Sequence, residues 1–195
     1  MTLILPMISS GYIAVSEADL ALTFYESAYG TSIGTTDVYV VDTSGNIIGS
    51  SVYSSSGDTG TPNWVLATAS ARVVSDTFRI AWHVVKQAGF LADYAVDTVT
   101  LQGVSYNFDS NNNGFLTTIN TNTTSSTTAL SGAVSVPNRS FPQLGRWGRH
   151  SGSTPSSPTG PTSAQSGSFH LYTESSLSEY DDVVNFWLFS PEITA

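Results

Sequence analysis

The chain contains no cysteine, and it has few charged residues for its length of 195. The absence of cysteine excludes disulfide bonds, thiolate metal sites and cysteine nucleophiles. Lys, Arg, Asp and Glu together make up 11% of the residues, well below the roughly 25% of an ordinary globular domain. Ser, Thr, Gly and Asn take their place, a composition typical of a β-rich extracellular or particle protein rather than of a cytosolic enzyme.

Positive charge is scarcest of all. The 6 Lys and Arg residues stand against 15 Asp and Glu residues, which gives a formal net charge of −9. The few arginines are scattered along the chain, so no basic stripe is available to neutralise phosphates. This distribution argues against a nucleic-acid partner.

The N-terminal stretch MTLILPMISSGY is apolar, but it has no Lys or Arg before it, and Pro6 interrupts it. It resembles neither a signal peptide nor a membrane span, for which it is too short. We therefore expect synthesis in a cytoplasm and no membrane crossing. Residues 1–18 are predicted to form an N-terminal arm or docking strand, and residues 19–195 a single domain.

Apolar and polar residues alternate over many short segments. Residues 19–26 place Leu20, Leu22 and Phe24 on one face, and residues 78–85 alternate in the same way. Residues 42–46 read as a hairpin turn, and residues 92–101 as a strand with a bulge near Asp97. No segment sustains the 3.6-residue period of a long helix. The pattern predicts an all-β fold, a jelly-roll β-sandwich.

The stretch from residue 147 to residue 193 organises the rest of the chain. Its first part is rich in Gly, Ser, Thr and Pro and cannot form regular structure, so residues 153–166 are predicted to cover one sheet. Two strands follow, at residues 168–173 and 183–189. The Asn/Ser/Thr-rich middle, residues 107–128, is expected to pack in part through Phe115, and a further strand is predicted at residues 129–136.

Two parts of the chain resemble MAM domains, the jelly-roll modules of meprins, neuropilins and receptor tyrosine phosphatases. YNFDSNNNGF (106–115), WGRHSGSTPSSPTGP (147–161), LYTESS (171–176) and FWLFSPEI (186–193) resemble the first half of such a domain. LALTFYESAYGTSIGTTDVYVV (20–41), NWVLATA (63–69) and FRIAWHVVKQAGFLADYAVDTVTL (78–101) resemble the second half. The resemblance implies a MAM-like, concanavalin-like sandwich whose halves occur in circularly permuted order.

In that permuted arrangement, the natural ends of the family are joined through Gln102-Gly103. Permutation within one chain is physically reasonable because jelly-roll termini lie close together at the surface. The alternative is exchange, in which the C-terminal half of one chain completes the N-terminal half of a neighbour. The chain departs from the family in lacking its cysteines, in carrying Ser163, Ala164 and Gln165 where an aspartate is usual, and in the Thr/Ser-rich insert at residues 121–140.

Asp93, Asp97 and Asp109 are the candidate metal ligands. The resemblance implies that the strand bearing Asp93 and Asp97 leads to the strand start at Asp109, where some MAM-like jelly rolls hold a cation. Carboxylates with nearby backbone carbonyls suit Ca²⁺, which prefers hard oxygen ligands. We therefore predict a structural calcium ion there, with capping of turns by the same aspartates as the alternative.

Other chemistry finds little support in the sequence. His83, His150 and His170 occur at unrelated spacings, which do not make a zinc motif. Glu179, Asp181 and Asp182 read as a solvated turn rather than as paired catalytic carboxylates. Aromatics such as Tyr172, Tyr180 and Trp147 are able to stack on sugars but are more often core or interface residues. We expect no catalytic residue and no enzymatic activity.

These features together favour an accessory virion protein of a tailed bacteriophage, either a capsid decoration protein or a head or tail fibre component. Such a protein is made in the host cytoplasm and then contacts other virion proteins, and it is expected to form a homo-oligomer. Residues 1–16 are the expected docking arm. The alternative is an adhesin module that binds a cell-surface glycan or receptor through loops at one end of the sandwich.

Overall fold

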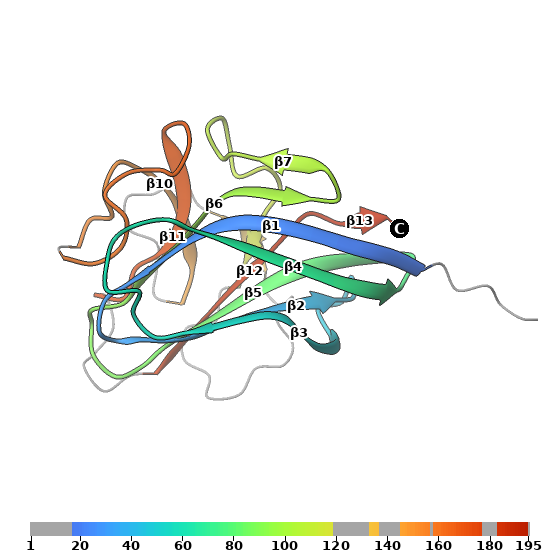
Figure 1. Cartoon of the computed structure of the whole chain (residues 1–195), viewed down its shortest axis with the longest axis horizontal. Coiled ribbons are helices and arrows are strands. Elements are labelled where there is room, and N and C mark those ends of the chain that lie inside the picture. Colours follow the sequence, from blue (N-terminus) through green and yellow to red (C-terminus); the bar gives the residue numbers. More distant parts are fainter. Residues whose placement is uncertain (1–16, 119–132, 137–144, 157, 177–182, 195) are drawn as a thin grey trace, which may run out of the picture.

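The computed structural model describes residues 17–118, 133–136, 145–156, 158–176 and 183–194, and every regular element in these ranges is a β-strand (Figure 1). The strands form two antiparallel sheets that pack as a jelly-roll-like sandwich, so the predicted all-β fold is confirmed. No helix in the described ranges is long and apolar enough to cross a membrane.

Each sheet is built from both parts of the chain. Sheet A has the order β10 (Trp147–Ser151), β11 (Phe169–Thr173), β6 (Asp93–Leu101), β1 (Glu17–Tyr29) and β4 (Val65–Val74), with β7 (Val104–Tyr106) paired to β6. Sheet B has the order β3 (Ile47–Ser56), β2 (Ile33–Val41), β5 (Thr77–Lys86), β12 (Val184–Phe189), β8 (Leu116–Thr117) and β9 (Val134–Ser135), with β13 (Ile193–Thr194) paired to β5. Strands from before and after Gln102-Gly103 therefore lie side by side in each sheet.

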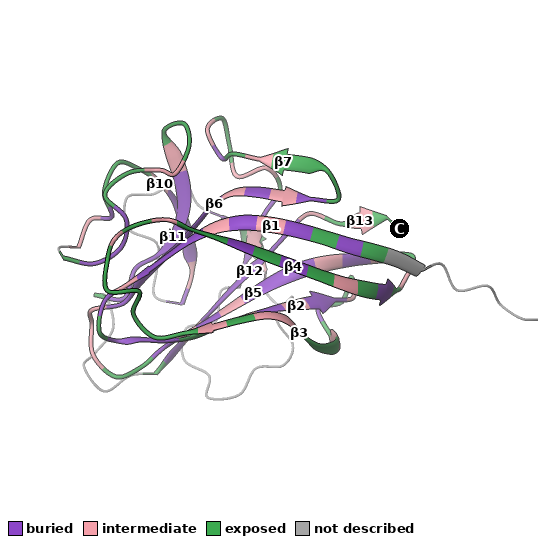
Figure 2. Cartoon of the chain, viewed as in Figure 1, coloured by how far each residue is buried: buried purple, intermediate pink, exposed green. Residues whose placement is uncertain are grey.

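The core lies between the two sheets and follows the alternation of the sequence (Figure 2). Leu20, Leu22 and Phe24 of β1 are at most 1% exposed, as expected for one face of a strand. The Phe24 ring meets Trp82 of β5 edge to face, with centroids 5.5 Å apart. Fully burying one such large apolar side chain stabilises the fold by about 1.5–3 kcal/mol.

Two turns and one β-bulge lie where the sequence predicts irregular backbone geometry. Asp42 accepts hydrogen bonds from the backbone N–H groups of Ser44 (2.9 Å) and Asn46 (2.8 Å), which closes the β2–β3 hairpin. Gln102 and Gly103 have φ angles of 50° and 78°, as in a type I′ turn between β6 and β7. The bulge near Asp97 is confirmed by a shift in the β1–β6 register beside Thr98, whose φ is 47°.

Some strand limits differ from the prediction. Residues 54–62 read as a polar loop in the sequence, but β3 extends to Ser56, because the Ser54 hydroxyl donates to Asp37 on the neighbouring strand (2.7 Å). The sequence predicts a short strand at residues 64–68, but β4 continues to Val74. Its buried positions are occupied mainly by small alanines, which give a weak apolar signal. Of the predicted strand at residues 129–136, the structure shows Val134–Ser135.

Several predicted features lie outside the described residues. The arm at residues 1–18 is one of them, apart from Glu17 and Ala18, with which β1 begins. The acidic turn with Glu179, Asp181 and Asp182 is another, together with Tyr180 and most of the insert at residues 121–140. These predictions stay predictions.

One carboxylate, Glu26 of β1, is buried inside the core. It is 4% exposed and accepts hydrogen bonds from the hydroxyl groups of Tyr53 and Tyr94. Burial together with the bond to Glu26 raises the pKa of Tyr53 to about 12. A buried charge needs such partners, and the cross-sheet bond to Tyr53 ties β1 of one sheet to β3 of the other.

Candidate functional site: a polar layer beneath a proline-rich loop

A proline-rich loop, residues 152–168, connects β10 to β11 and is here called the covering loop. It lies over the outward face of sheet A, as predicted for residues 153–166. On β6, Tyr94 and Val96 point into the core, so Asp93 and Asp97 point outward toward this loop. The outward-facing polar side chains under the loop are fully buried, and they are Asp93, Asp97, His170, Tyr172 and Glu174.

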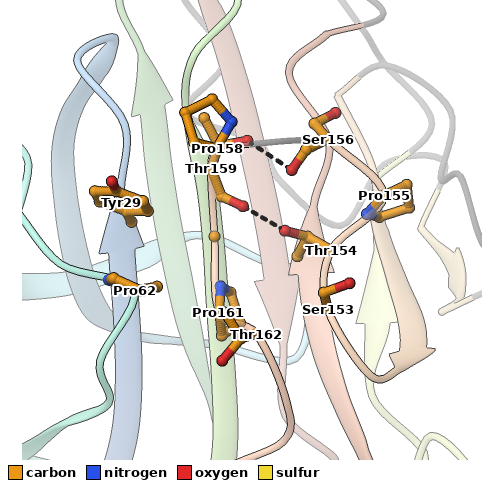
Figure 3. A pocket seen from close by; sticks show the side chains of 11 residues that line it. Tyr29, Pro62, Ser153, Thr154, Pro155, Ser156, Pro158, Thr159, Pro161 and Thr162 are labelled. Carbon is orange, nitrogen blue, oxygen red and sulfur yellow. Dashed lines mark hydrogen bonds between the residues drawn. The ribbon is translucent and has the colours of Figure 1, made fainter.

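Asp93 anchors the centre of the covering loop. Its Oδ2 accepts a hydrogen bond from the Thr159 hydroxyl (2.8 Å), and its Oδ1 accepts one from the backbone N–H of Ser175 (3.4 Å). The Thr154 hydroxyl donates to the Thr159 carbonyl (2.6 Å) and closes the loop on itself (Figure 3). Gly160 packs against this point so closely that an added Cβ would lie 2.9 Å from Asp93 Cβ.

Asp97 and Asp109 anchor the end of the same loop. Oδ2 of Asp97 accepts hydrogen bonds from the backbone N–H groups of Gln165 (2.9 Å) and Ser166 (3.1 Å). Oδ1 of Asp109 accepts those of Ser168 (2.7 Å) and Phe169 (3.1 Å). Backbone donors in a row make a favourable anion site, and charge-assisted bonds of this kind are stronger than neutral ones.

The three predicted metal ligands therefore all contact the covering loop, but each has its own set of donors. Among the described residues, no group of three or more His, Asp or Glu side chains is arranged to hold a metal ion. The groups that point at these carboxylates are N–H and O–H donors, and a calcium ion would instead need further oxygen atoms around it. The geometry favours anchoring of the distant covering loop by Asp93, Asp97 and Asp109, a structural role that differs from the local turn capping given as the alternative, and calcium binding stays a prediction.

Calcium addition separates the two roles. If the aspartates act as loop anchors, changing from a chelator to millimolar calcium is expected to shift the melting temperature by less than about 1 °C, because no preformed site binds the ion. Differential scanning calorimetry of the purified chain measures this shift. A calcium-dependent rise of several degrees would instead establish the structural calcium site.

Asp93 faces a second buried carboxylate, Glu174. The β6–β11 register pairs Leu171 with Val96 and Tyr172 with Ala95, so two further steps place Glu174 opposite Asp93. Glu174 Oε1 accepts the Ser156 hydroxyl (2.7 Å), whereas its buried Oε2 has no hydrogen-bond partner among the described residues. Burial raises the pKa of Asp93 to about 7, and the charge of Glu174 acts in the same direction. The pair therefore retains a proton up to near-neutral pH.

Asp97 differs from Asp93 in what surrounds it. Burial raises the pKa of Asp97 to about 6, although three backbone hydrogen bonds, led by that of Ser166, act to lower it. The nearby charge of Asp109 adds a smaller upward effect. Both outward-facing aspartates of β6 are therefore harder to ionise than an ordinary aspartate. Their pKa values fall toward the ordinary value when the protein unfolds, because the carboxyl groups then become solvated.

Two histidines lie side by side in the same layer. His150 and His170 are direct cross-strand partners in the β10–β11 pair, with ring centroids 6.1 Å apart. His170 is fully buried, Trp64 packs against it at 5.7 Å, and neither of its ring nitrogens has a hydrogen-bond partner among the described residues. Burial lowers the pKa of His170 to about 3, so this ring is neutral in the folded protein at physiological pH.

His170 is therefore expected to destabilise the fold in acid. Its folded pKa lies below its unfolded value of 6.5, so the unfolded chain takes up a proton as the pH falls below about 6.5, and stability falls with it. Relative to wild type, His170→Phe should gain about 2 kcal/mol of unfolding free energy between about pH 7 and pH 4.5. Urea denaturation at both pH values measures this gain. His150→Phe is the matched control, because it leaves the buried ring of His170 in place and should keep most of the wild-type loss of stability in acid. Equal behaviour of the two variants would contradict the assignment.

A pocket of about 370 Å³ opens on the surface of the covering loop (Figure 3). Tyr29 and Pro62 form one side, and residues 153–156 and 158–162 of the loop form the rest. Every described lining residue is uncharged, and all except Gly160 offer a ring or a hydroxyl group. Trp147 and Tyr172, which the sequence named as aromatics for stacking on sugars, are instead fully buried, so Tyr29 is the aromatic residue available at this pocket.

Sequence reasoning located the aspartates but missed Glu174 and the contact between the histidines. Both depend on the register between distant strands, which no local pattern reveals. The sequence did indicate that β11 has a polar outer face, because His170 and Tyr172 alternate with apolar residues. It did not indicate that a loop covers this face. No family model matches the chain, and neither a curated protein nor a solved structure matches it.

Proposed function

We propose that the chain is a non-enzymatic structural protein that acts through protein–protein contacts, as an accessory component of a tailed-phage particle. The observation that carries this proposal is the open edge of sheet A. β4 is 10 residues long, pairs only with β1 among the described strands, and exposes Leu66 (53%) and Val74 (51%). Long, regular edges with apolar side chains favour association with another chain.

The polar layer supports a structural role over a catalytic one. Its carboxylates are covered by the loop and accept hydrogen bonds from that loop, with Asp97 and Asp109 held by backbone donors. A catalytic acid or base has to reach a substrate, whereas Asp93 and Glu174 are 0% exposed. These buried carboxylates therefore stabilise the covering loop against the outer face of sheet A.

Composition supports placement in a virus particle. The chain lacks cysteine and is rich in Ser, Thr and Gly, which suits a protein made in a reducing cytoplasm that later works outside the cell. Residues 1–16 carry no charged residue and serve in this proposal as a docking arm. The MAM-like, permuted origin belongs to the same proposal and is supported by the resemblance of residues 20–101 and 104–193.

Quantitative mass spectrometry of purified particles tests the proposal. Hundreds of copies per particle would indicate a decoration of the shell, as either a capsid or head component, and a handful would indicate a tail or fibre component. Deleting residues 1–16 is expected to reduce incorporation. Absence of the protein from particles would overturn the virion assignment.

The pocket beside Tyr29 favours a second candidate function, an adhesin that binds a cell-surface glycan. An aromatic ring beside hydroxyl groups, without charge, suits a neutral sugar. Glycan-array binding that is lost in Tyr29→Ala, with the fold unchanged by circular dichroism, would support it. Binding that persists in Tyr29→Ala would place the glycan elsewhere.

A further inference from the structure

At the outer edge of sheet A, alternate residues of β4 direct their backbone groups away from β1. Ala21 of β1 donates its N–H to Oε1 of Gln102 (2.8 Å), and its carbonyl accepts the N–H of Gln102 (3.0 Å). Both backbone groups of Ala21 therefore point away from β4. Ser70 lies opposite Ala21 in the β1–β4 register, so this pair is not hydrogen-bonded, and the N–H and C=O of Ser70 point toward the open edge.

The same alternation applies along the whole strand. The β1–β4 register runs without a shift from Val65 to Val74, so every second residue directs its backbone groups outward. The residues with outward backbone groups are Leu66, Thr68, Ser70, Arg72 and Val74. The other edge strands are less suitable for pairing with a further strand. The β2–β3 pairing is irregular between Val38 and Val40, and the edge strands β10 and β9 have only 5 and 2 residues.

We propose that β4 pairs antiparallel with β4 of a second copy of the chain, with the two-fold axis at Ser70. In this register Ser70 meets Ser70, Thr68 meets Arg72, and Leu66 meets Val74. All of these positions have outward backbone groups, so each pair exchanges hydrogen bonds across the interface. Their side chains also lie on one face, because opposite residues in such a pair share a face.

The side chains of β4 complement those of a second β4 in this register, and for this reason we take a second copy of the chain as the partner. The exposed Leu66 and Val74 cover each other at both ends of the interface. The only charged residue of β4, Arg72, falls opposite Thr68 and not opposite its own copy, so no like charges meet. An axis at Ala69 would instead place Leu66 against Arg72. The pairing would join sheet A of both copies into one continuous sheet and form a closed, two-fold dimer.

This inference deepens the proposed structural function and rests on it for its biological use, but its test needs only the purified full chain. Analytical ultracentrifugation is expected to give twice the 20.6 kDa mass of the chain. Ser70→Pro removes an N–H group that faces the open edge and not β1, so this variant should keep its melting temperature and sediment as a monomer. A wild-type chain that stays monomeric at the highest attainable concentration would overturn the proposal.

Single cysteines in this cysteine-free chain test the register. Ser70→Cys is expected to form a disulfide-linked dimer under mild oxidation, because opposite Cα atoms lie about 5.5 Å apart, within disulfide range. Thr68→Cys is the matched control on the same strand and face. Its two copies would lie about 14 Å apart in this register, so it should not cross-link.

Cross-linking of Thr68→Cys as fast as Ser70→Cys, or a dimer that forms without the Ser70→Cys cross-link, would overturn the inference. The second result would mean that another segment, such as residues 1–16 of a neighbour, occupies the edge. These outcomes are independent of particle composition. Particles that contain a monomeric chain would refute the β4 pairing alone, and a dimer that is absent from particles would refute the virion role alone.

Discussion

Gly167→Ala is expected to lower the free energy of unfolding by about 2–4 kcal/mol, because it combines backbone strain with the loss of charge-assisted hydrogen bonds. Gly167 has a φ of 65°, and a Cβ placed there would overlap both carboxylate oxygens of Asp109. The Asp109 side chain would have to move, and it would release the N–H groups of Ser168 and Phe169. Urea denaturation of the purified chain measures the loss.

Gly152→Ala is the matched control in the same loop. Gly152 also has a positive φ, 78°, but a Cβ added there meets no atom within 4 Å. Its replacement carries the backbone strain alone, about 1–2 kcal/mol. Equal losses in the two variants would show that Asp109 contributes nothing to holding the loop.

Asp93→Asn is expected to stabilise the protein at neutral and higher pH. The pKa of Asp93 is raised to about 7 in the folded protein, so the folded state holds a proton that the unfolded state releases above its ordinary pKa. Stability therefore falls as the pH rises from about 4 to 7, and the penalty is complete above the folded value. Asparagine removes this penalty, and its amide can donate to Oε2 of Glu174, which has no hydrogen-bond partner in the part of the chain that the structure describes.

The expected gain is about 2–4 kcal/mol at about pH 8 and disappears at about pH 4, since one pKa unit corresponds to about 1.4 kcal/mol. Asp97 and His170 keep their own pH dependence in the variant, so the difference from wild type isolates Asp93. Urea denaturation across this pH range gives the curve. Asp19→Asn, at an exposed position of β1, is the control. A variant that is less stable than wild type at pH 8 would contradict the protonated pair.

The sequence predicts the strands well where large apolar residues alternate. β1 and β5 follow from Leu20, Phe24 and Trp82, because a period of two leaves one face buried. β4 is longer than predicted because alanine at positions 67, 69 and 71 carries little hydrophobic signal. The open edge therefore became visible only when the register of all 10 residues against β1 was known.

The candidate site was predictable in part. The resemblance implied that Asp93 and Asp97 lie near Asp109, and all three aspartates contact the covering loop. Their role was not fixed by sequence, because Thr159, Gln165 and the other loop donors lie more than 60 residues away along the chain. Glu174 and the contact of His170 with His150 were missed for the same reason, because the sequence near a buried residue does not identify its partner on another strand.

Buried aspartates hold the covering loop against sheet A. Amide hydrogen exchange of the purified chain, followed by NMR, tests this most directly at Gln165, Ser166 and Ser168, whose N–H groups donate to Asp97 and Asp109. We expect slow exchange at all three in wild type, and loss of protection at Gln165 and Ser166 alone in Asp97→Ala. Exchange at the unprotected rate in wild type would contradict the account.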